Sequence, residues 1–430
     1  MSLIQHQLNN HEETLAKMGE IPPVSIISIF HPNAETTDSS QAVAQLRSRL
    51  SSVVRANPWV CGYIQKCPTT SKYNICFHET VTDSDVDKIF HHAVVDDDMK
   101  WASMGGENFK NVKYHDDIQL LVDVTSKYIV KSGHKKDFDD AKLSHLLPLM
   151  RYTVITNTHN TKLAVVLSVS HYVADGSCFY KLLHMIHSVE DIVSLNPKRL
   201  KFIPKRLTRF SSLTINNAFR ISLVLVSTLI ALIVKYTWGL KLNKQTMYAV
   251  VSKEHVKSKK EEYGSSDEEF WVSSNDIIVS DMANVLDVGC ADVVVDMRNR
   301  LPGCETNLAG NYLDFIFLSR NLFETPAKVR QHLRRGLESW KPAFDMISGY
   351  YKGFLCTTNW ASLSKELIVD GYSEAFHYPL VNVPDYLASR FYMGYFTVIF
   401  RCYKDYASVQ VTSAGEAIPK KLKQAGLFYN

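Results

Sequence analysis

Charge is sparse in this 430-residue sequence: Asp, Glu, Lys and Arg make up 21% of it, and the formal net charge is only +4. So small a basic excess argues against a dedicated nucleic-acid-binding protein. Hydrophobic residues make up 46% of the chain, an ordinary share for a globular protein, which excludes a disordered or collagen-like chain. The length predicts two or three domains.

The cysteines show no spacing typical of a disulfide framework or a metal site. The eight cysteines are scattered, and no C-x-x-C occurs, so the sequence predicts neither a disulfide framework nor a zinc site. The first 20 residues are polar and lack the apolar core of a signal peptide. We therefore expect a cytoplasmic protein with reduced thiols and no bound metal.

Several common catalytic signatures are also missing. The sequence has no G-x-S-x-G, H-E-x-x-H, G-x-x-x-x-G-K-S/T or G-x-G-x-x-G. These absences argue against a serine hydrolase of the nucleophile-elbow type, a zinc protease, a P-loop enzyme and a Rossmann-type enzyme.

Hydrophobic periodicity alternates between helical and strand-like along the whole chain, which predicts an α/β or α+β fold with two similar-sized domains. The expected helices cover 40–56 and 326–341. The expected strands cover 23–30, 152–156, 163–170, 293–296, 312–318, 391–401 and 407–412. We expect surface loops and short helices over 82–98 and 114–123, and a charged, flexible stretch over 252–270. The predicted division is an N-terminal domain over 1–195, a crossover and linker over 196–265, and a C-terminal domain over 266–430.

The motif most suggestive of chemistry is H-x-x-x-D-G, formed by His171, Asp175 and Gly176 between an apolar strand and an amphipathic helix. In one interpretation, a neutral imidazole at the strand end takes a proton from an alcohol or amine. Gly176 then permits the tight bend into the helix. In the other interpretation, His171 is a satisfied polar residue and Asp175 only caps the helix.

Three further segments shift this balance. Asp296 to Pro302 reads D-M-R-N-R-L-P and is followed by Gly310-Asn311, and Ser273 to Asp276 reads S-S-N-D. Taken in chain order with the H-x-x-x-D-G motif, these segments resemble the BAHD acyltransferases and the wider chloramphenicol-acetyltransferase-like (CAT-like) superfamily, which includes condensation domains. The resemblance runs from about residue 40 to the C-terminus. The D-F-G-W-G motif of plant members is lost around Trp360 and Val369–Tyr372, so the chain looks like a divergent member.

The resemblance implies two CAT-like domains, each a mixed sheet flanked by helices, with a channel between them. It implies acyl transfer from acyl-CoA, a co-substrate rather than a bound cofactor, to the hydroxyl or, less favoured, the amine of a hydrophobic acceptor such as a lipophilic alcohol. His171 would be the general base. Asp175 would be structural and pair with Arg298, or with Arg300 as second choice.

Other residues have two open interpretations. Ser273 or Asn275 could donate a hydrogen bond to the tetrahedral oxyanion, but a Ser before an apolar helix is also an ordinary N-cap. Trp360 and Tyr372 could line the channel or belong to the core.

One segment concentrates both basic and apolar residues. Ten Lys or Arg and no Asp or Glu lie between Lys198 and Lys244, around a 14-residue apolar run at 221–234. A helix that spans a bilayer needs roughly 20 apolar residues. We expect 220–238 to contact a membrane surface peripherally, on the cytosolic face of an internal membrane. The alternative is a crossover helix packed on the core, with its basic flanks near the CoA phosphates.

Four functions therefore compete. The favoured one is a monomeric O-acyltransferase of ester biosynthesis in secondary metabolism, with no nucleic-acid partner. A wax-ester or diacylglycerol acyltransferase usually shows His-His-x-x-x-Asp-Gly, and Ser170 stands in place of its first histidine. A condensation module would need a carrier-protein partner. A non-catalytic binding protein on the same fold would not need both His171 and Asp175.

Overall fold

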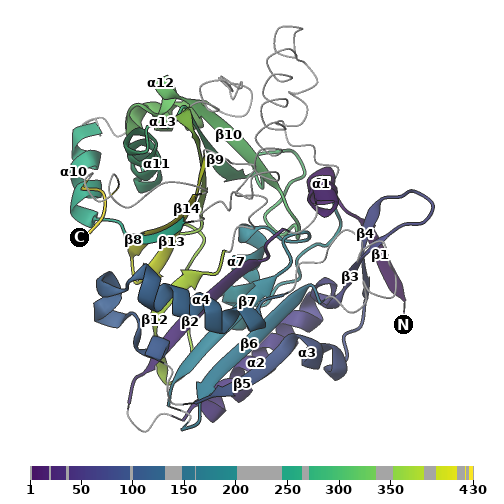
Figure 1. Cartoon of the computed structure of the whole chain (residues 1–430). Coiled ribbons are helices and arrows are strands. Elements are labelled where there is room, and N and C mark those ends of the chain that lie inside the picture. The colour runs from purple at the N-terminus through teal and green to yellow at the C-terminus, as the bar shows by residue number, and fades with distance from the viewer. Residues whose placement is uncertain are drawn as a thin grey trace, which may run out of the picture.

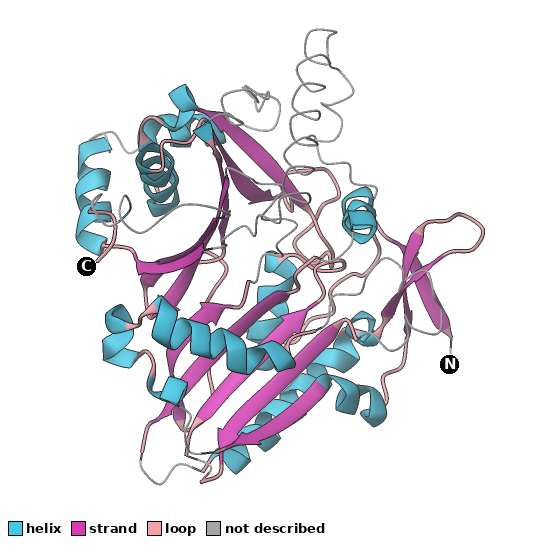
Figure 2. Ribbon diagram, in the orientation of Figure 1, coloured by secondary structure: helices cyan, strands magenta, loops and turns pink. Residues whose placement is uncertain are grey.

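The computed structural model describes most of the chain and builds it around three β-sheets (Figure 1). The described residues are 2–18, 21–34, 38–96, 100–130, 148–159, 161–200, 245–263, 271–335, 352–381, 394–413, 422 and 426–429. Figure 2 shows helices on both sides of the five-stranded sheet and beside the six-stranded sheet.

The five-stranded sheet has the order β12-β2-β7-β6-β5, and only the β5–β6 pair is parallel. Its strands are β2 (Val24–Pro32), β5 (Phe90–Val95), β6 (Met150–Asn157), β7 (Leu163–Val169) and β12 (Tyr372–Pro379). Every residue of β7 is buried, because both faces of this central strand are covered, which confirms the strand predicted from its apolar run. Helices α2 (Ser39–Ala56), α3 (Asp83–Ile89), α4 (Gln119–Thr125) and α7 (Gly176–Ile186) flank the sheet, and α2 packs against α7.

The six-stranded sheet has the order β10-β9-β11-β13-β14-β8, with β11 parallel to both of its neighbours. Its strands are β8 (Gln245–Val250), β9 (Cys290–Asp296), β10 (Leu313–Ser319), β11 (Phe354–Asn359), β13 (Gly394–Tyr403) and β14 (Tyr406–Ser413). The helices beside it are α10 (Lys253–Tyr263), α11 (Ser274–Val285), α12 (Arg320–Phe323) and α13 (Pro326–Arg334). Apolar side chains of α11, such as Ile278 and Met282, form a second core with the sheet, distinct from the larger core around β7.

A small antiparallel sheet stands apart at one side of the molecule (Figure 1). Its strands, in the order β1-β4-β3, are β1 (Leu3–Gln7), β3 (Tyr63–Lys66) and β4 (Tyr73–His78). Helix α1 (Asn10–Met18) follows β1 directly and lies between the small sheet and the rest of the molecule (Figure 1).

Two strands lie in sheets that the predicted division of the chain does not suggest. Strand β12 comes from the C-terminal part of the chain but pairs with β2, and β8 lies within the predicted linker but forms an edge of the six-stranded sheet. Buried Glu374 on β12 pairs with Arg401 on β13 at 2.5 Å, which ties the two sheets together. The boundaries at 195 and 265 stay predictions.

Three local expectations are wrong in part. The stretch 82–98, expected to hold only loops and short helices, contains strand β5, whose partly exposed residues at a sheet edge give a weak apolar signal. The charged stretch 252–270, expected to be flexible, contains α10, a helix with no buried residue and therefore with little apolar signal in its sequence. The helix expected over 326–341 ends at Arg334, and the residues from 336 lie outside the described ranges.

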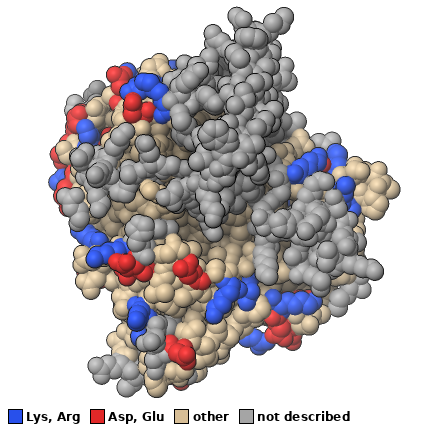
Figure 3. Space-filling view, in the orientation of Figure 1, with Lys and Arg blue, Asp and Glu red and all other residues tan. Residues whose placement is uncertain are grey.

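The apolar run 221–234 and the proposed contact segment 220–238 also lie outside the described residues. Along the described parts of the chain, every helix is too short or too polar to cross a bilayer. Arg199 also belongs to the basic stretch, but its side chain is only 2% exposed and pairs with Glu12, so its charge does not face a membrane. On the face shown in Figure 3, the described acidic and basic side chains are mixed.

Candidate active site

The H-x-x-x-D-G motif forms a tight turn between β7 and α7. The Val173 N–H bonds the Ser170 carbonyl at 3.2 Å, which closes the turn, and α7 begins at Gly176. Asp175 is the N-cap of this helix, and its Oδ1 accepts from the Cys178 N–H at 2.9 Å. The strand therefore projects His171 from the end of a rigid, fully buried element.

The His171 ring has a defined tautomer. Its Nδ1 lies 2.9 Å from the Ala174 carbonyl oxygen, and because a carbonyl can only accept, Nδ1 carries the proton. Nε2 is then the nitrogen with a free lone pair. Burial lowers the pKa of this half-buried imidazole below its ordinary value of 6.5, although the Asp175 charge opposes the shift. The ring is therefore neutral and basic near pH 7.

Asp175 is fully buried and pairs with Arg298. Its Oδ2 accepts from Arg298 Nη1 at 2.8 Å and from the Tyr312 N–H at 2.9 Å. Burial opposes the ionisation of this carboxyl, but the Arg298 charge and the hydrogen bonds outweigh burial and hold the pKa of Asp175 below its ordinary value.

Arg298 connects the turn to the loop that follows β9. Its guanidinium also donates to the carbonyls of Leu308 at 3.0 Å and Gly310 at 2.8 Å, and to Asp296 at 3.0 Å. Arg300, the second candidate, is exposed on the same loop. Of the two arginines, Arg298 is thus the one that pairs with Asp175.

Asn311 holds the His171 backbone, a contact that its place in the sequence did not indicate. Its Nδ2 donates to the His171 carbonyl at 2.8 Å. The preceding Gly310 has a φ of +132°, which side-chain-bearing residues rarely adopt, and a Cβ there would lie 3.0 Å from Glu12 Oε1. The Gly-Asn pair therefore lets the loop pass close to the turn and clamp it.

The two predicted oxyanion donors have different surroundings. Ser273 is the N-cap of α11 and forms a capping box with Asp276, its Oγ donating to Asp276 Oδ2 at 2.8 Å. That hydroxyl is therefore committed to the helix cap. Asn275 accepts a hydrogen bond at Oδ1 from Asn359 Nδ2 at 3.0 Å, which leaves its own Nδ2 as a donor.

Trp360 and Tyr372 lie at different places. A Cβ added to Gly176 would lie 3.4 Å from Trp360 Nε1, so this indole contacts the start of α7 beside the turn. Tyr372 pairs with Pro32, whereas Val169, two residues before His171, pairs with Val24. Eight residues of β2 separate these points, or roughly 26 Å at 3.3 Å per residue. Tyr372 therefore lies at the opposite end of the sheet from His171.

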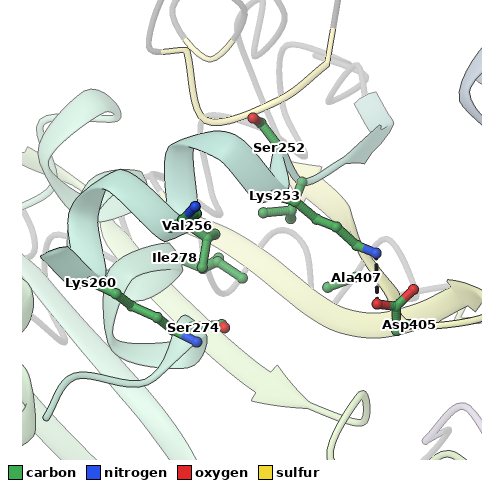
Figure 4. Close-up of a pocket in the computed structure, with 10 residues that line it drawn as sticks. Ser252, Lys253, Val256, Lys260, Ser274, Ile278, Asp405 and Ala407 are labelled. Atoms are coloured by element: carbon green, nitrogen blue, oxygen red, sulfur yellow. Dashed lines mark ion pairs between the residues drawn. The ribbon is translucent and has the colours of Figure 1, made fainter.

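A separate cavity of about 310 Å³ lies between α10, α11 and β14 (Figure 4). Its lining includes Lys257, Lys260 and Ser274, and Lys253 at its edge pairs with Asp405 at 2.7 Å. None of these elements carries the His171 turn. Within the described ranges, no three His, Cys, Asp or Glu side chains are grouped so that they could hold a metal ion.

Comparisons of sequence find no family model and no curated protein that matches this chain. Comparison of structure does find similar proteins. Vinorine synthase is 13% identical and has a TM-score of 0.55, and the match covers 95% of this chain and 90% of that protein.

Two further solved structures are similar over nearly their full lengths. TRI101 of F. graminearum, in complex with coenzyme A and T-2 mycotoxin, is 10% identical with a TM-score of 0.58, and 98% of this chain and 96% of that chain are covered. The first condensation domain of the CDA synthetase is 10% identical with a TM-score of 0.55, over 98% of this chain and 95% of that one. At such low identity the likeness establishes the fold. The prediction of a mixed α/β fold with two CAT-like domains is thereby confirmed, and this chain is a divergent example of that fold.

Proposed function

We propose that this protein transfers an acyl group from acyl-CoA to a hydroxyl of a hydrophobic acceptor, with His171 as the general base. The observation that carries the proposal is the tautomer of His171. Its Nδ1–H is held by the Ala174 carbonyl, so the basic lone pair is at Nε2 on a neutral ring. The complex of TRI101 with coenzyme A and T-2 mycotoxin supports a co-substrate of this class.

A single imidazole can accept and then return the one proton that the reaction transfers. Nε2 takes the proton of the acceptor hydroxyl while its oxygen attacks the thioester carbonyl. The tetrahedral intermediate collapses, the carbon–sulfur bond breaks, and the imidazolium returns its proton to the departing CoA thiolate. General acid–base catalysis of this kind contributes about 10²–10⁴-fold.

Asp175 has a positioning role in this proposal, because its carboxylate is used by Arg298, Tyr312 and Cys178. Of the two candidate oxyanion donors we retain Asn275, whose Nδ2 is a donor, rather than the capping Ser273. Trp360 is retained as a residue beside the turn, and Tyr372 is not retained, because it lies far along the sheet.

The direct experiment is product analysis. The purified protein is incubated with a panel of acyl-CoAs and with lipophilic alcohols, amines, long-chain alcohols and diacylglycerol, and each acceptor is examined for an added acyl mass. Alkaline hydroxylamine cleaves an oxygen ester but not an amide, so it separates O-transfer from N-transfer. A product only on long-chain alcohols or diacylglycerol would favour the neutral-lipid alternative. Binding of acyl-CoA without any acyl product would favour a non-catalytic protein.

The cellular setting stays a prediction from the sequence. A monomer at the cytosolic face of an internal membrane would meet a lipid-dissolved acceptor, and its contact would use the 220–238 segment, which lies outside the described residues. Nothing in this setting is needed for the acid–base steps above.

A further inference from the structure

A second buried ion pair lies beside the His171 turn, in addition to Asp175–Arg298. Glu12 on α1 and Arg199 pair at 2.9 Å between Oε2 and Nε, and their side chains are 0% and 2% exposed. Glu12 also forms a capping box with Asn9, its Oε2 accepting from the Asn9 N–H at 3.1 Å while Asn9 Oδ1 accepts from the Glu12 N–H at 2.9 Å. A simple helix cap would not require a buried arginine.

Arg199 contacts the turn directly, and Glu12 acts on it through Asn311. Arg199 Nη2 donates to the carbonyl of Val173 at 3.1 Å, inside the H-x-x-x-D-G motif. Glu12 Oε1 accepts from the Asn311 N–H at 3.0 Å, and the side chain of that same Asn311 donates to the His171 carbonyl. Asn9 Nδ2 donates to the Asn311 carbonyl at 3.0 Å, so the start of α1 holds this residue at both backbone polar groups.

Three backbone carbonyls of the turn each accept a hydrogen bond from a different side chain. The carbonyl of His171 is bound by Asn311, that of Val173 by Arg199, and that of Ala174 by the His171 ring itself. Arg199 also donates to the Ala309 carbonyl at 2.8 Å, so the loop that carries Asn311 lies between the two buried ion pairs.

The pKa of Glu12 shifts in the opposite direction from that of Asp175, the acid of the other buried ion pair. Burial raises the pKa of Glu12, and the opposing effects of Arg199 and of the backbone hydrogen bonds do not fully compensate. Replacement of both members of a buried ion pair by neutral groups can leave a fold intact, whereas removal of one member leaves the other charge buried without its partner and lowers stability. A variant of one member therefore needs a readout at the His171 turn that a loss of stability alone would not change.

We propose that the Glu12–Arg199 pair is a positioning device that holds the His171 turn in the geometry in which Nδ1 is protonated and Nε2 is free. This inference rests on the proposed function for its catalytic consequence but not for the ring geometry. Glu12 and Arg199 touch the backbone of the turn and the residue that clamps it, and they act through His171.

The test is the variant Glu12→Gln with Glu13→Gln as its matched control. The two residues are neighbours on α1, and Glu13 is paired with Lys17 at 2.8 Å, away from the turn. A Gln amide has one acceptor oxygen, so it cannot accept from Arg199, Asn9 and Asn311 as the two carboxylate oxygens do. We expect Glu12→Gln to lower the melting temperature, because the buried Arg199 charge loses its carboxylate partner, so kcat is measured at a temperature at which both proteins are fully folded. We also expect kcat to fall about tenfold, with the KM for acyl-CoA nearly unchanged, because the proposed effect is on the ring that takes the proton and not on substrate binding.

A second readout does not depend on activity. Nitrogen-15 NMR of histidine-labelled protein, with the His171 signal assigned from His171→Ala, reports which ring nitrogen carries the proton. We expect Nδ1–H in the wild type and in Glu13→Gln, and a rise of the Nε2–H tautomer in Glu12→Gln. Should Glu12→Gln fail to fold, Arg199→Lys replaces it, because an ammonium keeps the charge but lacks the fork that reaches Glu12 and Val173 together.

The outcomes distinguish the proposed acyl-transfer function from the proposed positioning role of the Glu12–Arg199 pair. If the wild type transfers no acyl group, the proposed function fails, and the tautomer measurement still decides the positioning role. If the variant keeps both the wild-type tautomer and the wild-type kcat, the positioning role is refuted. It is refuted equally if activity falls only in proportion to the loss of folded protein.

Discussion

The Asp175–Arg298 pair should be essential for stability. Asp175 is 0% exposed and accepts three hydrogen bonds, from Arg298, Tyr312 and Cys178. The substitution Asp175→Ala leaves the buried Arg298 charge without its best partner, at a cost of ~3–5 kcal/mol, and removes the cap of α7, which costs about 1 kcal/mol more. The sum, about 4–6 kcal/mol, is a large share of the 5–15 kcal/mol that typically stabilises a domain.

Urea unfolding followed by tryptophan fluorescence measures this loss. Asp296→Ala is the matched control, because Asp296 contacts the same guanidinium at 3.0 Å but its side chain is 33% exposed, and its removal should cost about 1 kcal/mol or less. The pH dependence has a defined sign. The native pKa of Asp175 lies below the ordinary 3.8, so the stability from this group is complete above about pH 4 and is lost as the pH falls through the native pKa. An Asp175→Ala protein that unfolds within about 1 kcal/mol of the wild type would refute the reasoning.

Three further outcomes are expected. Because burial lowers the pKa of His171, kcat/KM should fall with decreasing pH only below the ordinary histidine value of 6.5, and a pH–rate profile measures this directly. Gly310→Ala should lower the melting temperature and the activity together, since its φ is +132° and its new Cβ would press on Glu12; calorimetry with an activity assay checks both. Deletion of 215–240 should abolish flotation with anionic liposomes, and unchanged flotation would count against the membrane contact.

The elements near the site were predictable where the physical signal is local. Strand β7 is a continuous apolar run because it is buried on both faces, and the His171 turn follows from its place between this run and an amphipathic helix. The pairing of Asp175 with Arg298 spans 123 residues, so no local pattern contains it. It was implied only by the resemblance to a family.

Other parts of the site could not be read from the sequence. Glu12 lies in a polar N-terminal stretch that looks like surface, and Arg199 begins a basic stretch that suggests a solvated or membrane-facing charge. Both are buried because α1 and the residues before the crossover meet over the His171 turn, a contact between segments that are far apart in the chain. The pairing of β12 with β2 escaped prediction for the same reason, since a strand's own sequence does not name its partner.

The most direct test of the central claim is the release of free CoA thiol from acyl-CoA in the presence of a lipophilic alcohol. Wild-type protein, His171→Ala and a surface control, His78→Ala, are compared after equal folding has been verified by circular dichroism. We predict thiol release that depends on the alcohol in the wild type and in His78→Ala, and a loss of about 10²-fold or more in His171→Ala. Equal, alcohol-dependent rates in all three proteins would contradict the assignment of His171 as the base.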